Sequence, residues 1–146
     1  MVINRSAPTA TVVPVLIYGD VGQAIDWLCR AFGFVERLRA ERDGVIGHAQ
    51  LTAAEGAIRL GRQGGPYRAP HGNEVTASVH VAVDDVDRHS ERAKECGARI
   101  VQAPADLPFG VRQYTARDYT GHWWTFSQNI ANVAPEEWGD RSPASH

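Results

Sequence analysis

Long apolar runs are missing from this sequence. No segment approaches the roughly 20 consecutive apolar residues that a membrane-spanning helix needs, and the first residues lack the apolar core of a signal peptide. We therefore expect a soluble, cytoplasmic protein that has no membrane partner.

Cysteine is scarce, and neither sign of charge is in excess. The two cysteines, Cys29 and Cys96, lack C-x-x-C spacing and fall in helical patterns, so we expect reduced, half-buried thiols, with a disulfide as the alternative. Fifteen Lys and Arg against 17 Asp and Glu give a net charge of −2. Without a basic patch, nucleic acid is excluded as a partner.

The 146 residues, of which 43% are hydrophobic, form one globular domain by size. A strand-like segment at 11–18 is followed by a helical stripe (Ile25, Leu28, Cys29, Phe32) between a cap at Asp20 and a stop at Gly33. Further strands are expected near 34–40, 45–52 and 57–62. The second half repeats this order, with a strand at 76–83, a helix from about 86 to 96, and strands near 99–102, 111–117 and 122–128.

Spacing supports an internal duplication. Asp20 and Asp85 are 65 residues apart, as are Gly56 and Gly121. We predict an α+β fold of two βαβββ modules packed as one domain. Its parts are an N-terminal tail (1–10), a first module (11–62), a Gly- and Pro-rich linker (63–75), a second module (76–128) and a C-terminal tail (129–146).

Three stretches of the sequence point to a known family. They are D-D-V-D at 84–87, the helix end at Gly97-Ala98, and A-R-D-Y-T-G-H-W-W-T-F at 116–126. Over about residues 11 to 129 the chain resembles the vicinal oxygen chelate superfamily, which includes glyoxalases, bleomycin-resistance proteins, fosfomycin-modifying enzymes and extradiol dioxygenases. The resemblance implies curved sheets around a cavity and a homodimer. Many members bind a divalent metal there, and others bind drugs without one.

The positions that carry metal ligands in such proteins hold poor donors here. The resemblance places these positions on the first and last strands of each module, at Val13, Leu60, Ser78 and Thr125. Two of these side chains are aliphatic, and hydroxyls are weak ligands for the metals that prefer imidazole and carboxylate. We therefore expect no metal and no other cofactor.

Alternation along the strands predicts which side chains line the cavity. Residues that share a face with Ser78 form the expected wall: Val13, Val15, Ile17, Ile58, Leu60, His80, Ala82, Trp123, Thr125 and Ser127. Trp123 is the candidate for stacking on a planar ligand, and Tyr114 and Arg112 are further candidate contacts. The opposite face should pack under the helices: Val79, Val81, Val83, Trp124 and Phe126.

His80 is the single imidazole in this apolar wall. It is either a wall residue bonded to a neighbouring hydroxyl, a direct ligand contact, or a general base, although no carboxylate nearby in the sequence would orient it. Asp118 and His122 should stabilise a turn, and Phe109-Gly110 belongs to a loop that could cover the cavity. Trp138 in the tail either docks on a partner subunit or is mobile. The helix face that includes His89 is expected to be solvated.

Three functions stay open. One is a metal-independent protein that binds a small planar or aromatic molecule, in the manner of bleomycin-resistance proteins, with drug sequestration and antibiotic resistance as its role. The second is an enzyme, either an isomerase or lyase that uses His80 as acid and base, or a dioxygenase-like protein with an unusual metal site such as His48 and His80. The third is a dimer without a small ligand. Whether the chain is an enzyme is therefore undecided, with binding favoured.

Overall fold

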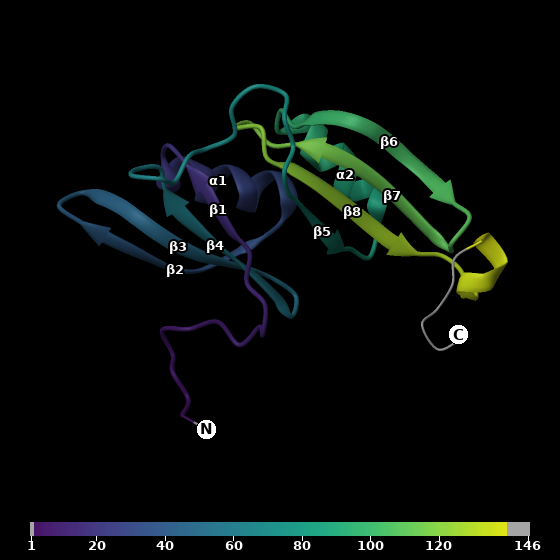
Figure 1. Cartoon of the computed structure of the whole chain (residues 1–146), viewed down its shortest axis with the longest axis horizontal. Helices are drawn as coiled ribbons and strands as arrows, with labels where there is room; N and C mark the ends of the chain where they lie inside the picture. The colour runs from purple at the N-terminus through teal and green to yellow at the C-terminus, as the bar shows by residue number, and fades with distance from the viewer. Residues whose placement is uncertain (1, 140–146) are drawn as a thin grey trace.

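The computed structural model describes residues 2–139 and shows two modules side by side, each a four-stranded sheet with one helix (Figure 1). The elements are β1 (Val15–Tyr18), α1 (Val21–Phe32), β2 (Val35–Arg42), β3 (Val45–Ala53), β4 (Gly56–Arg62), β5 (Ser78–Ala82), α2 (Val86–Glu95), β6 (Arg99–Leu107), β7 (Val111–Arg117), β8 (Trp123–Asn129) and η1 (Pro135–Trp138). The sheet orders are β1-β4-β3-β2 and β5-β8-β7-β6. The α+β fold of two βαβββ modules is confirmed, and the sheets do not close into a barrel.

Both helices begin at the predicted caps. The side chains of Asp20 and Asp85 accept hydrogen bonds from the backbone N–H groups of Gln23 and Arg88, three residues further on, which satisfies N–H groups that the first helical turn leaves free. Helix α1 ends at Gly33, whose φ of 76° lies in the left-handed region that glycine adopts without strain. Neither helix in the described part of the chain is long and apolar enough to cross a bilayer.

The first and last strands of each module run parallel. Val15 pairs with Arg59 in the first sheet, and His80 pairs with Thr125 in the second. Val15 and His80 are 65 residues apart, as predicted, but Arg59 and Thr125 are 66 apart. The difference arises in the turns before the last strands. Gly56 is already part of β4 and pairs with Ala53 of β3, whereas Gly121 lies in the connection between β7 and β8. The duplication is therefore offset by one residue in its last strands.

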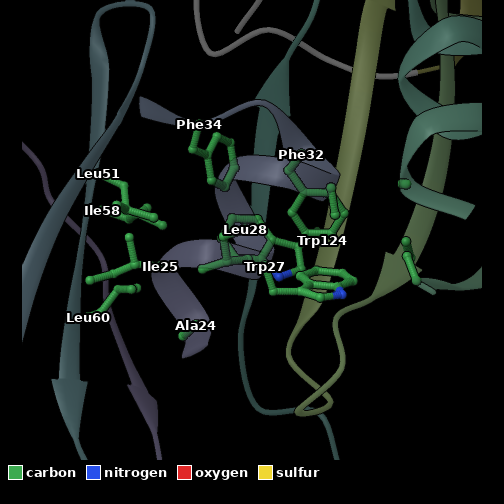
Figure 2. Packing of buried hydrophobic residues seen from close by; sticks show 14 of the residues in the cluster. Ala24, Ile25, Trp27, Leu28, Phe32, Phe34, Leu51, Ile58, Leu60 and Trp124 are labelled. Carbon is green, nitrogen blue, oxygen red and sulfur yellow. The ribbon is translucent and has the colours of Figure 1, made fainter. Parts of the chain in front are cut away.

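The core lies between the sheets and the helices (Figure 2). Trp124 and Phe126 are fully buried there, and Val79, Val81 and Val83 pack against them as partly buried residues, as predicted for that strand face. We call the other face of each sheet, away from the helices, its open face.

A buried carboxylate joins the two modules. The Oδ1 atom of Asp118 accepts hydrogen bonds from the backbone N–H groups of Thr120, Gly121 and His122, as predicted for this turn. Its Oδ2 atom accepts hydrogen bonds from Trp124 Nε1 and from the Tyr18 hydroxyl in the other module. The imidazole Nε2 of His122 lies 2.7 Å from the carbonyl oxygen of Ile17, so this residue is structural as expected.

The N-terminal segment lies across the open face of the first sheet. The expected strand from Thr11 begins only at Val15, directly after Pro14, which has no N–H to donate to a sheet. The side chains of Arg37 and Gln50 donate hydrogen bonds to the carbonyl oxygens of Arg5 and Ser6, at 2.7 and 2.9 Å. The segment therefore covers Gln50, which is 1% exposed.

The segment after residue 102 differs from its prediction. Strand β6 continues to Leu107, so most of the expected loop over the cavity is sheet. Phe109 lies at the turn into β7, at the far end of this sheet, and its ring contacts Trp138 with centroids 4.9 Å apart. Trp138 thus packs against its own chain in this structure.

Candidate functional site

A pocket of about 540 Å³ lies where the first module meets the edge strand β5. The turn between β3 and β4 forms one side, β5 forms another, and the segment before β1 contributes Val12 and Pro14. Its lining residues are Val12, Pro14, Phe34, Leu51, Thr52, Ala53, Ala54, Glu55, Gly56, Ala57, Ile58, Val79, His80, Val81 and Ala82. This volume falls within the roughly 300–1,000 Å³ of small-molecule sites.

The walls of the pocket are mainly apolar. Phe34, Leu51 and Ile58 reach it from the core of the first module, and Val79 and Val81 reach it from β5. The polar side chains of the lining are Thr52, Glu55 and His80. An apolar hollow with a few polar groups binds the body of a ligand by shape and fixes its orientation by hydrogen bonds.

His80 lies at the edge of this pocket on the open face of β5. Its Nε2 atom is 2.8 Å from the hydroxyl oxygen of Ser127, the neighbour of Ala82 on β8. The expected hydrogen bond to a neighbouring hydroxyl is present, whereas a ligand contact and a role as general base stay predictions. Within residues 2–139 its Nδ1 atom has no hydrogen-bond partner and no carboxylate orients the ring. The ring therefore has one nitrogen free for a ligand.

Three predicted site residues share the open face with His80 but do not line the pocket. Ser78 pairs with Trp123, and His80 pairs with Thr125. Trp123 and Thr125 are half-buried, and the Thr125 hydroxyl lies 3.0 Å from the hydroxyl of Thr115 on β7. Their placement on this face is as predicted, whereas their contact with a ligand stays a prediction.

In the first module, only part of the predicted wall is on the open face. Val15 and Ile17 pair with Arg59 and Gly61 there, and Val13 lies two residues before β1. The prediction for Leu60 is wrong: it is fully buried and points toward α1 beside Ile25 (Figure 2). The one-residue offset of β4 explains the error, because a shift of one residue moves a side chain to the other face of a strand.

Ile58 lies on the same side of β4 as Leu60 and also packs in the core, although its exposed part reaches the pocket. Arg59 takes the open-face position that corresponds to Thr125, since both are paired directly to the first strand of their modules.

The candidates Tyr114 and Arg112 are on the helix side of the second sheet, so neither faces the predicted cavity. Tyr114 pairs with the core residue Phe126 and is fully buried. Arg112 forms ion pairs with Asp87 on α2 and with Asp106, both at 3.0 Å. The buried position of Phe126 was foreseeable from alternation, but the residue opposite it on β7 was not, because that depends on the length of the intervening turn.

The sequence suggested that His89 belongs to a solvated helix face, and this prediction is wrong. Its Nε2 atom lies 2.9 Å from the carbonyl oxygen of Phe32 at the end of α1, and its Nδ1 atom contacts the Tyr114 hydroxyl. Burial lowers the pKa of His89, and the charge of Arg92 lowers it further, against the opposing effect of the Phe32 carbonyl. Burial has the opposite effect on Tyr114 and raises its pKa, because the charged form of a phenol is the deprotonated one. This histidine joins α2 to the first module.

The donor set at the open face does not fit the metal site that the resemblance implies. With the observed offset, the four positions hold Val13, Arg59, Ser78 and Thr125, which offer neither imidazole nor carboxylate. Across the part of the chain that the structure describes, no group of three or more His, Cys, Asp or Glu side chains is arranged to hold a metal ion.

Comparison with known proteins agrees with this architecture. The family model described as "Glyoxalase/Bleomycin resistance protein/Dioxygenase superfamily" matches residues 10–126. The uncharacterized protein Rv0887c of Mycobacterium tuberculosis is 33% identical over an alignment of 133 positions that covers 85% of this chain and 77% of that protein. The uncharacterized protein Mb0911c of Mycobacterium bovis is 33% identical over the same length, 86% of its own chain.

Solved structures show the same fold. The crystal structure of TioX from Micromonospora sp. ML1 is 40% identical in sequence with a TM-score of 0.70, covering 83% of this chain and 99% of TioX. FosX, a genomically encoded fosfomycin resistance protein from Listeria monocytogenes, is 14% identical with a TM-score of 0.64, covering 85% of this chain and 96% of FosX, and this likeness concerns the fold alone. The chain belongs to the glyoxalase/bleomycin resistance protein/dioxygenase superfamily.

Proposed function

We propose that this protein binds a small planar or aromatic molecule without the help of a metal, and that sequestration of such a molecule, a drug for example, is its role. The observation that carries the proposal is the apolar pocket at β5 with one imidazole nitrogen free at its edge. The family includes bleomycin resistance proteins, which is consistent with such a role.

Binding asks less of this site than catalysis does. An apolar hollow, aromatic contacts worth about 0.5–1.5 kcal/mol each, and a few hydrogen bonds are sufficient for affinity. Phe34 supplies an aromatic wall from the core side of the pocket. Trp123 lies on the same sheet face as His80, two residues along the strands, and offers a second ring to a ligand that covers this face.

We also propose that the protein is a homodimer. Val15 is 51% exposed on the open face of the first sheet, at an edge strand, although it is apolar. A second copy would cover the part of this face around Val15 that the N-terminal segment leaves exposed, and would enclose the pocket further. Light scattering coupled to size exclusion tests this part separately, and a monomeric mass at micromolar concentration would contradict it.

Calorimetric and tryptophan-fluorescence titrations against a panel of planar aromatic compounds test the binding proposal. We expect saturable binding at one site per chain, weakened about tenfold by His80→Ala because a hydrogen bond in a partly dry site is lost. His48→Ala is the matched control, since His48 is an exposed histidine on β3 outside the pocket. Equal loss in both variants, or no binding by any compound of the panel, would contradict the proposal.

An enzymatic role is the second candidate, and the free Nδ1 atom of His80 at the pocket edge favours it. An imidazole there could accept a proton from a bound substrate. Chromatography of each bound compound after incubation distinguishes the two roles. Conversion that stops in His80→Ala while binding persists would make the protein an enzyme.

A further inference from the structure

The open face of the second sheet carries positive charge without any carboxylate. Cross-strand pairing places Arg99 beside Arg117, Arg117 beside Trp123, and Trp123 beside Ser78. We call these four side chains the arginine row. The row of His80, Thr125 and Thr115 lies directly next to it. All strand residues of this face lie in the described part of the chain, and none of them is Asp or Glu. The whole chain, by contrast, has a net charge of −2.

Neither arginine of the row has a partner within residues 2–139. The ion pairs of the described chain use Arg39 and Arg112 instead. The Nε atom of Arg117 is buried and makes no hydrogen bond, and its guanidinium lies close to Gly121 at the turn before β8. Buried donors are nearly always paired in folded proteins, so the chain itself leaves the hydrogen-bonding capacity of this arginine partly unused.

The pairing of Arg99 with Arg117 is itself unfavourable. Like charges directly opposite on neighbouring strands destabilise a sheet. An anion bound by the terminal N–H groups of both guanidiniums would offset the repulsion, because a guanidinium binds a carboxylate through two parallel hydrogen bonds. The row therefore has the features of an anion site that is incomplete without its ligand.

We propose that Arg99 and Arg117 bind the carboxylate of the ligand, so that the molecules this protein takes are planar aromatic acids. The inference rests on the proposed function and specifies its ligand class. The aromatic body covers Trp123 and Thr125, and its far end enters the pocket beside His80. The pocket lining contains the carboxylate of Glu55. It would repel an acid group, so the carboxylate of the ligand is favoured at the arginine row.

Strand geometry sets the size of such a ligand. From His80 on β5 to Arg117 on β7 the path crosses two strand spacings and two residues along the strand, about 12 Å between Cα atoms. Side chains from both ends shorten the gap that a ligand must bridge. A fused two-ring acid fits this span, and its rings would lie over the indole of Trp123.

The test compares 2-naphthoate with 2-naphthamide, which has the same shape without the charge. Calorimetric titration of the full chain at low salt should show the acid binding about tenfold more tightly than the amide, as expected for a charge-assisted hydrogen bond in a partly exposed site. In Arg117→Gln the acid should lose this advantage while the amide binds as before. Arg99→Gln should show a smaller loss.

Arg88→Gln is the matched control, because Arg88 is an exposed arginine on α2, on the other side of the sheet. Thermal unfolding verifies that each variant is folded. Equal affinity for the acid and the amide in the unmodified protein would overturn the inference and leave the proposed function intact. An acid preference that survives both arginine substitutions would also overturn it. If neither compound binds at millimolar concentration, the inference and the proposed function both fail for this ligand class.

Discussion

The hydroxyl of Tyr18 donates a 2.7 Å hydrogen bond to Asp118 across 100 positions of the chain. Tyr18 ends the first strand of one module, and Asp118 begins the turn before the last strand of the other. Both residues are buried, so the bond exists only when the modules are docked. The carboxylate also organises the turn that precedes Trp123, which makes it a structural support of the proposed ligand face.

Asp118→Asn should lower the free energy of unfolding by about 2–3 kcal/mol. An amide keeps one acceptor oxygen, but its NH₂ group faces the donors of Tyr18 and Trp124, which are then left unsatisfied. Urea unfolding followed by circular dichroism measures the change. Tyr18→Phe should cost about 1–2 kcal/mol, because only one of the bonds to the carboxylate is lost.

Tyr67→Phe is the control for these two variants, since Tyr67 is 60% exposed in the linker. Its effect should stay within about 0.5 kcal/mol. A result in which Asp118→Asn is no more destabilising than Tyr67→Phe would show that this carboxylate does not join the modules.

The buried histidine His89 should make stability depend on pH. Burial lowers its pKa in the folded protein, whereas the unfolded chain binds a proton near the usual value of about 6.5. The unfolded state therefore holds more protons between these two values, and stability rises with pH in that window. The contribution of His89 is complete above about pH 6.5 and is lost as the pH falls toward the folded pKa.

Urea titrations between pH 7.5 and pH 5 test this dependence. His89→Gln should be less stable than the unmodified protein at pH 7.5, because its contacts with Phe32 and Tyr114 are lost, and its stability should fall less steeply with decreasing pH. The exposed His48→Gln should keep the full slope. An unchanged slope in His89→Gln would assign the pH dependence to other groups.

We further predict that Zn, Ni, Mn and Fe are not retained in stoichiometric amounts after titration and desalting. The positions Val13, Arg59, Ser78 and Thr125 supply no imidazole or carboxylate to hold such ions. Ligand affinity should accordingly be the same before and after treatment with a chelator. One bound metal ion per chain in elemental analysis, lost together with ligand binding on chelation, would overturn the metal-free mechanism.

Most of the fold was predictable because its signals are local. The caps at Asp20 and Asp85 and the stop at Gly33 define the helices through contacts within one turn. The 65-residue repeat then placed β5 and α2 correctly. The repeat gave the wrong register for β4. Gly56 belongs to a tight turn and to β4 itself, whereas Gly121 lies in a longer connection before β8, so the two glycines are not at equivalent positions. Strand register depends on turn length, which composition does not reveal.

The candidate site was predictable only in part for the same reason. The open-face position of His80 and its bond to a hydroxyl follow from alternation within β5. The pocket itself involves Phe34 and the turn at residues 52–57, which are brought to β5 by the packing of one module against the other. Arg117 was missed because its significance lies in having Arg99 as its cross-strand neighbour, and this depends on how β6 pairs with β7.

The most direct test of the account is a titration of the ¹⁵N-labelled protein with 2-naphthoate, followed by backbone NMR spectra. We predict chemical-shift changes at residues 52–57 and 79–82, which line the pocket, continuing to Trp123 and Arg117 on the adjoining sheet face. Changes confined to a different hollow, such as that between Val21, Gly22 and Ile46, would contradict the claim that the β5 pocket is the ligand site.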